Sequence, residues 1–460
     1  MADLAIHRGA ASRVLAATCI SYTVVLLDAS IVNVALAEIG HTLGSSVAGL
    51  QWIVNAYTLT FASLLMTGGT LGDRFGARNV YLTGLTVFVL GSVLCGCAPN
   101  LATLSLARAL QGIGSALLVP CSLALINDAY PHPTRRAAAV SLWMGCGGVA
   151  MASGPLIGGL LIHSFGWRSI FFVNVPIGLA GVWLAQAVER TPVERTASSR
   201  TRHVDLPGQL AVAVALASLI GVLIEGHRLG WQSAPIVAGM TISVAAWTTF
   251  FVVEFRTRHP MLPMQFFRNA LFSASTLVSM ISAFVFYGML FTFSLFYQQA
   301  RDYSALDTGL AFLPMTAMVA LGGLLSSRVV KRLGVRESMC VAFALYALGA
   351  LGMSFATANS PYWLAVAPML AIGMASGFIS PAATSPALGT VDRQRVGIAA
   401  AVLNSARQSG SALGVAVFGT FISTAHVFQA AMNLILGIVV TLSMFAAGVW
   451  WMAARAHGSR

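Results

Sequence analysis

The chain consists largely of apolar stretches, each long enough to cross a membrane, that alternate with short segments rich in turn residues and arginine. A helix needs about 20 mostly apolar residues to cross the hydrocarbon core of a bilayer. Each stretch exceeds the length of a typical strand, which favours helices. We predict fourteen spans, at residues 14–36, 48–70, 80–98, 102–126, 138–162, 170–189, 206–226, 235–255, 271–298, 307–327, 338–357, 362–387, 396–423 and 431–453.

The amino-acid composition excludes the other broad classes of protein. Apolar residues make up 57 % of the 460 residues and charged residues only 9 %, whereas soluble domains carry about 25 % charged residues. A disordered chain is excluded as well, because disordered chains have few apolar residues. The expected fold class is an all-α polytopic membrane protein.

The net charge of +12 would by itself suit a nucleic-acid-binding protein. The basic residues lie at the ends of the apolar stretches, however. Most of them are in segments that would face the same side of the membrane as the N-terminus. This distribution follows the positive-inside rule of membrane proteins. We expect both termini in the cytoplasm, the bilayer as the chain's surroundings, and no nucleic-acid partner.

An internal repeat divides the chain. Residues 112–120 (GIGSALLVP) and 373–381 (GMASGFISP) share glycine, serine and proline at identical spacing, and the loops at 74–78 and 332–336 are similar. Chance similarity between helices rich in small residues is the alternative. The repeat predicts two parallel six-helix bundles, at 1–189 and 269–460, with a cytoplasmic linker and two additional helices at 190–268.

Residues that would support enzymatic chemistry are scarce. The single lysine, Lys331, follows Val330, so no phosphate-binding loop with a lysine after glycine is present. The histidines lie in loops or near span ends, and the six cysteines form no CxxC pair. We therefore expect no enzyme activity, no metal site and no cofactor.

Charged residues inside the spans are the strongest functional candidates. An ionisable side chain at the centre of a bilayer costs about 2.5–3.5 kcal/mol on insertion scales, yet Asp28, Arg108 and Arg407 all lie within predicted spans. A carboxyl group in such surroundings can exchange a proton, so Asp28 is the candidate for proton coupling. The alternative is a fixed Asp–Arg pair. Glu225, near a span end, is a second candidate.

Arg108 lies one helical turn before Gln111, so the two side chains share a helix face. Together they could hold Asp28, polarise a buried water or bind an anionic group. An arginine that only packs between helices and bonds to backbone carbonyls is the alternative. We expect polar and aromatic residues of the spans to line a substrate cavity: Asn33, Trp52, Asn55, Tyr57, Gln111, Tyr287, Phe291 and Arg407.

Two segments are candidates for conformational gating. The loop after the second span mixes one acid with basic residues, and the fifth span contains a glycine–proline pair among other glycines. The acid could meet the positive end of a neighbouring helix, and the proline could mark a bend at a moving interface. A turn that only sets topology and close helix packing are the alternatives. The gating candidates are Gly72, Asp73, Arg74, Gly76, Arg78, Gly154 and Pro155.

These segments together resemble the fourteen-span drug:proton antiporter branch of the major facilitator superfamily, and within it the methylenomycin-resistance-type exporters. The resemblance to this branch rests on residues 27–36 (LDASIVNVAL), 72–76 (GDRFG), 104–114 with Arg108 and Gln111, 154–159, 166–174 and 404–408. The similarity to the methylenomycin-resistance-type exporters rests on residues 224–226 with 229–231 and on residues 360–363. It implies a major facilitator fold in the bacterial cytoplasmic membrane, working as a monomer. It also implies export of small antibiotics or toxic compounds by alternating access, in exchange for protons.

The family's first-span acid corresponds to Asp28, its fourth-span arginine to Arg108, its gating aspartate to Asp73, and its antiporter glycine–proline to Gly154 and Pro155. The sequence also departs from the family. Ala37 replaces a proline that usually follows the first-span motif, and Met369 occupies the position that repeats Arg108 in the second half.

The charges inside the spans bear on the substrate. Only one acid lies deep in a span, against two arginines, so we expect apolar substrates that are neutral or weakly acidic rather than dicationic. A proton-coupled uptake symporter with the same fold is the alternative to an exporter.

Overall fold

The computed structural model describes residues 2–186, 205–257, 262–392, 395–425 and 427–458, and long helices account for nearly all of this part of the chain. The N-terminal half consists of α1 (Ala2–Leu43), α2 (Val47–Phe75), α3 (Ala77–Gly96), α4 (Leu101–Ala129), α5 (Pro133–Phe165), α6 (Ser169–Phe172) and α7 (Asn174–Gln186). Two further helices follow, α8 (Leu206–Leu229) and α9 (Ala234–Arg256). The C-terminal half consists of η1 (Met264–Arg268), α10 (Ala270–Leu295), η2 (Phe296–Ala300), α11 (Ala305–Leu333), α12 (Val335–Met353), α13 (Trp363–Gly389), α14 (Val396–Thr424) and α15 (Phe428–Gly458).

The predicted all-helical membrane architecture is confirmed. Among the described residues, 12 helical segments are long and apolar enough to cross a membrane, α6 and α7 counting as one. The remaining two predicted spans correspond to α2 and α14, each of 29 residues, which are equally long but more polar. These two helices pack against each other across the two halves. Their polar side chains therefore have protein neighbours in place of lipid.

Two predicted spans differ in detail from the observed helices. The first helix continues past residue 36 to Leu43, and it ends where Gly44 adopts a φ of 61°, a conformation that favours glycine. The predicted span 170–189 is divided into α6 and α7, with the backbone turning at Val173. The end of that span, and with it the predicted boundary at residue 189, lies outside the described residues.

The two halves repeat the same helix pairings. In the N-terminal half α1 packs on α5, α2 on α4 and α3 on α4; in the C-terminal half α10 packs on α14, α11 on α13 and α12 on α13. The repeated glycines occupy equivalent places. A Cβ on Gly112 would collide with the carbonyl oxygen of Tyr57, and one on Gly373 with that of Met315. In both halves, therefore, a glycine lets the backbones of neighbouring helices approach closely.

The additional helix α8 contacts both halves, because it packs against α2 and α14, while α9 packs on α8. The Trp52 indole nitrogen donates to Oε1 of Glu225 at 2.9 Å, and the Thr420 hydroxyl donates to the carbonyl of Leu223 at 2.7 Å. Glu225 also pairs with Arg228 at 2.6 Å. Helix α8 is thereby fixed to the contact between the two halves.

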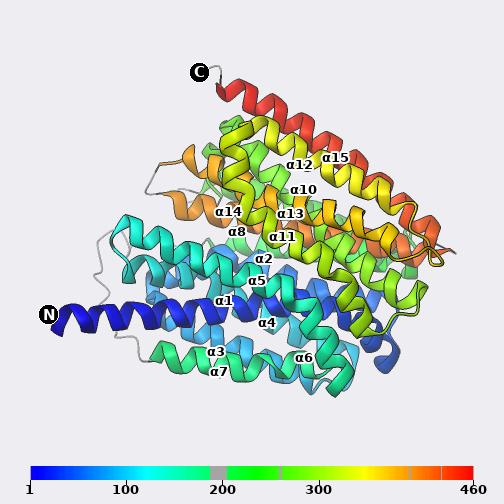
Figure 1. The fold of residues 1–460 in the computed structure, drawn as a ribbon, viewed down its shortest axis with the longest axis horizontal. Helices are drawn as coiled ribbons and strands as arrows, with labels where there is room; N and C mark the ends of the chain where they lie inside the picture. Colours follow the sequence, from blue (N-terminus) through cyan, green and yellow to red (C-terminus); the bar gives the residue numbers. More distant parts are fainter. Residues whose placement is uncertain (1, 187–204, 258–261, 393–394, 426, 459–460) are drawn as a thin grey trace.

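Helix α1 begins and α15 ends on the same side of the molecule (Figure 1); we call this side the terminal face. The two halves meet near the opposite face. There the Gln51 side-chain amide donates to the carbonyls of Val415 and Ala416 at 3.1 and 2.6 Å. A Cβ on Gly159 of α5 would lie 2.7 Å from the carbonyl oxygen of Ala305 in α11. The opposite face is therefore closed by direct packing.

Candidate functional site

A cavity of about 1220 Å³ lies between the two halves. Its walls come from α1, α2, α4 and α5 on one side and from α13 and α14 on the other. Residues of α9 and η1, and Asp205 just before α8, line its outer part. The lining includes Asp73, Asp205 and Arg395, which lie at helix ends on the terminal face. The cavity therefore extends from the interior to the terminal face, and its volume suffices for a drug-sized molecule.

The interior part of the cavity combines aromatic and cationic side chains. Tyr22 of α1 and Trp143 of α5 stack with ring centroids 3.9 Å apart and planes 19° apart. Both line the cavity, as does Arg407 of α14. Apolar side chains such as Leu65 and Met66 complete the wall. The surface suits a mostly apolar ligand with a few polar groups.

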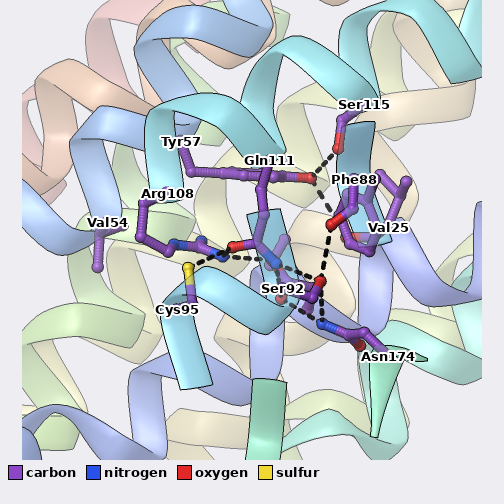
Figure 2. Close-up of polar contacts among 12 residues, drawn as sticks. Val25, Val54, Tyr57, Phe88, Ser92, Cys95, Arg108, Gln111, Ser115 and Asn174 are labelled. Carbon is purple, nitrogen blue, oxygen red and sulfur yellow. Dashed lines mark hydrogen bonds and ion pairs between the residues drawn. The ribbon is translucent and has the colours of Figure 1, made fainter. Parts of the chain in front are cut away.

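A second polar site lies wholly within the N-terminal half. The Asp28 carboxylate forms an ion pair with Arg108, and the two side chains are 0 % and 1 % exposed. Asp28 Oδ1 accepts from the amide of Asn174 at 2.8 Å and from that of Gln111 at 3.2 Å. Gln111 also donates to the Ser92 hydroxyl at 2.8 Å. Figure 2 shows Arg108, Gln111, Ser92 and Asn174 converging within this network.

Arg108 is held from several directions. It donates to Oε1 of Gln111 at 2.8 Å and to the carbonyl of Ile53 at 3.2 Å. Its guanidinium lies over the Tyr57 ring, 4.4 Å from the centroid, and 5.9 Å from that of Phe171. These contacts stabilise a buried positive charge that would otherwise be very unfavourable in the membrane. The proton-coupling candidates thus meet in one pair, which lies outside the cavity lining.

Of the eight residues expected to line a substrate cavity, Arg407 is in the lining of the cavity described above. Gln111 and Tyr57 instead belong to the surroundings of Arg108. Trp52 bonds to Glu225 near the opposite face. Asn55 is fully buried in α2, and neither polar atom of its side chain has a partner among the described residues.

The other three expected cavity residues lie near the contact between the halves. The Asn33 side chain donates to the carbonyl of Ala29 at 3.1 Å, and the Asn33 backbone carbonyl accepts from the hydroxyl of Ser294 in α10. Phe291 is fully buried in the core. The Tyr287 hydroxyl lies 4.0 Å from the Met151 sulfur, across α10 and α5.

The gating candidates fall into two places. Gly72 and Asp73 line the cavity near the terminal face, Arg74 lies over the Phe75 ring, and Arg78 donates to the carbonyl of Gln186 at 3.0 Å. Gly76 has a φ of 90°, which requires glycine between α2 and α3.

Gly154 and Pro155 lie elsewhere, within the packing of α5 on α1 and α11. A Cβ on Gly154 would collide with the Ser30 hydroxyl, and a Cβ on Gly309 of α11 with the Pro155 carbonyl oxygen. The pair therefore lies where α5 contacts both α1 and the C-terminal half.

Sequence reasoning gave no role to several residues that the structure brings to these sites. Asn174 and Ser92 complete the Asp28 network, and Tyr22 and Trp143 form the aromatic wall of the cavity. Each is an ordinary residue type for a helix, so its importance comes from neighbours on other helices. Asn174 stands two residues after the phenylalanine pair at 171–172. Its place in the segment 166–174, which resembles the family, was the one local feature that pointed to it.

Comparison with known proteins identifies the family. The model of the Major Facilitator Superfamily matches residues 18–415. This chain belongs to the major facilitator superfamily. It is 35 % identical over 446 residues to the methylenomycin A resistance protein of Bacillus subtilis, covering 96 % of this chain and 94 % of that protein. It is 34 % identical over 409 residues to the multidrug resistance protein Stp of Mycobacterium tuberculosis, covering 89 % of this chain and 75 % of that protein.

A solved transporter structure has a similar fold. The crystal structure of the POT family transporter PepTSo superposes with a TM-score of 0.69 at 14 % identity, covering 97 % of this chain and 99 % of that one. Membership of the superfamily makes this chain a multi-pass membrane transporter rather than an enzyme. Its similarity to resistance proteins supports a role in efflux of small molecules.

Proposed function

We propose that this chain is a proton-coupled exporter of small apolar antibiotics or toxic compounds, of the fourteen-span drug:proton antiporter branch. It works as a monomer in the bacterial cytoplasmic membrane, with both termini in the cytoplasm. Residues 1–189 and 269–460 act as the two moving bundles, and residues 190–268 supply the linker and the two additional helices.

The observation that carries this proposal is the one-sided cavity between the halves. It extends to the terminal face, whereas Gln51 and Gly159 pack directly on the C-terminal half near the opposite face. A transporter that works by alternating access has such a state, in which its binding site is open to one compartment. With both termini in the cytoplasm, this state receives substrate from the cytoplasm.

Asp28 is the proposed proton carrier, for reasons of position as well as charge. In the present state its carboxylate is buried and paired with Arg108, outside the cavity lining. Protonation of Asp28 would remove its negative charge. Arg108 would then lack a counter-charge and keep its contacts with Gln111 and Tyr57. A buried pair that loses one charge becomes strongly unfavourable, so protonation favours a rearrangement of α1 against α4.

Helix α1 connects this proton site to the contact between the halves. Five residues beyond Asp28, the Asn33 carbonyl accepts from Ser294 of α10, and in between Ser30 packs on Gly154 of α5. A shift of α1 on protonation therefore acts directly on both the α1–α10 and the α1–α5 contacts. One proton crossing a potential of 100 mV supplies about 2.3 kcal/mol, enough for roughly fifty-fold accumulation at one proton per substrate.

The test uses purified protein in proteoliposomes, with an imposed proton gradient and a fluorescent pH probe. We expect a panel of neutral and weakly acidic apolar antibiotics to trigger proton movement, and the compounds to move against the proton flow. Movement of compound and proton in the same direction would instead establish the uptake symporter. Compound transport that ignores the proton gradient would overturn proton coupling. Dicationic dyes as the best substrates would overturn the proposed substrate class.

A further inference from the structure

We propose that the interior end of the cavity is an oxyanion-binding subsite, formed by Arg407 with the stacked pair Tyr22–Trp143. It would bind a carboxylate or another delocalised oxyanion attached to a flat unsaturated ring. The inference rests on the proposed function, because it specifies which apolar compounds the cavity selects.

The three side chains lie at a common depth although they come from three helices. Arg407 is 11 residues from the start of α14 at the terminal face, and Trp143 is 10 residues from the start of α5. At 1.5 Å per residue, both are about 15 Å below that face. The direct stacking contact places Tyr22 beside Trp143. The subsite therefore lies about a third of the way along α5 and α14 from the terminal face, with walls from both halves.

Arg407 is not neutralised by the protein. It is half-buried and lines the cavity, and within the described part of the chain its guanidinium forms neither an ion pair nor a hydrogen bond. The buried Arg108, in contrast, is paired with Asp28. A cation inside a membrane protein is unfavourable unless it has a partner or a function, and Arg407 faces a space large enough for a ligand.

The acids of the cavity lie far from this arginine along the helix axes. Asp73 is two residues from the end of α2, Glu254 is two residues from the end of α9, and Asp205 caps the start of α8. By helix rise they are about 12 Å or more closer to the terminal face than Arg407. The cavity thus has three carboxylates together with Arg395 at its entrance, and Arg407 at its interior end.

The aromatic pair adds a second indication of a ligand. Only 6 % of the Trp143 side chain is exposed, and its indole N–H has no hydrogen-bond partner among the described residues. The nitrogen itself is enclosed by protein, so Trp143 meets a ligand in the cavity through its ring and not through this N–H. The stacked rings of Tyr22 and Trp143 offer a broad, rigid surface, on which a planar unsaturated ring packs well.

The chemistry of the subsite follows from these groups. Arg407 presents five N–H donors in a planar fork that matches the two oxygens of a carboxylate. Apolar Leu65, Met66 and Met144 surround them. Such a surface favours an acceptor-rich anion on an apolar body over the uncharged ester of the same body.

The experiment measures binding to the purified full-length protein in detergent, with 2-naphthoate and its methyl ester as the matched probes. Isothermal titration of wild-type protein should show binding of the acid about tenfold or more tighter than that of the ester. In Arg407→Gln the affinity for the acid should fall about ten- to hundredfold while that for the ester stays the same. Arg407→Lys should recover part of the preference, because it keeps the charge but loses the fork.

Arg328→Gln is the matched control, since Arg328 is an exposed arginine of α11 outside the cavity lining. Trp143→Phe should weaken both probes by a similar factor if the ring surface binds the naphthalene. Thermal unfolding of each variant confirms that it is folded. Equal wild-type affinities for acid and ester, or an unchanged acid preference in Arg407→Gln, would overturn the inference.

The binding experiment and the proteoliposome experiment can succeed or fail independently of each other. Selective binding of 2-naphthoate by Arg407 without proton-linked transport in proteoliposomes would support the subsite and refute the antiporter. Proton-linked export of neutral antibiotics that is unchanged in Arg407→Gln, together with equal binding of acid and ester, would support the antiporter and refute the subsite.

Discussion

Asp28 of α1 and Arg108 of α4 form an ion pair that is sealed from solvent inside the N-terminal half, 80 residues apart in sequence. The amides of Gln111 and Asn174 bind the second carboxylate oxygen. Each charge therefore depends on the other, and the carboxylate also depends on hydrogen-bond donors from two more positions along the chain.

Asp28→Asn should abolish substrate-triggered proton movement and destabilise the protein. The variant leaves Arg108 without its counter-charge in a buried site, which costs about 3–5 kcal/mol. Proteoliposome pH measurements test the first effect, and thermal unfolding in detergent tests the second. Glu225→Gln is the control, because Glu225 pairs with the largely exposed Arg228 and such pairs contribute about 1 kcal/mol or less. Coupling lost in Glu225→Gln but kept in Asp28→Asn would transfer the proton to Glu225.

Gly112→Ala and Gly373→Ala should destabilise the protein to a similar extent, since a methyl group at either position meets a backbone carbonyl of the neighbouring helix. Overpacking of this kind costs about 1–3 kcal/mol. Gly437→Ala in α15 should be neutral or slightly stabilising, because a Cβ there meets open space. Thermal unfolding compares the three variants. A large loss in one half with none in the other would contradict the equivalence of the two repeats.

A disulfide across the opposite face should stop transport by holding the cavity in its observed state. The side chain of Gln51 occupies the space next to Gly419, so Gln51→Cys frees room for Gly419→Cys in a background without the native cysteines. Oxidation should lower export at least about tenfold, and a reductant should restore it. Each single cysteine variant is the control. Full export by the oxidised double variant would show that this face need not open.

Asp73→Asn should slow transport while leaving substrate affinity nearly unchanged. Asp73 lies at the cavity entrance near the end of α2, and it is proposed to favour one conformation rather than to bind substrate. We expect the turnover rate to fall about tenfold, with binding of the exported compound altered less than twofold. Asp302→Asn is the control, because Asp302 lies in a loop with a φ of 54° that asparagine also adopts readily. A large loss of affinity in Asp73→Asn would assign Asp73 to the binding site instead.

The sequence alone predicted the helices, the repeat and the unusual charges. Apolar length predicts a span because lipid offers no hydrogen-bond partner to an unpaired backbone. The shared glycine spacing of 112–120 and 373–381 predicted two equivalent halves, and the observed helix pairings repeat accordingly. Asp28 and Arg108 stood out because an isolated charge in lipid is costly. These signals are local, since each depends on residue type and spacing along one helix.

The partners of those residues were decided by the tertiary structure. Trp52 and Phe291 have side chains suited to a substrate cavity, yet Trp52 bonds to Glu225 and Phe291 is in the core, while Tyr22 and Trp143 form the cavity wall. In a chain whose helices are apolar on all sides, hydrophobic periodicity does not specify which face of each helix turns inward. Rotation of each helix is set by packing of small residues against backbone from distant segments, and only the assembled bundle determines that packing.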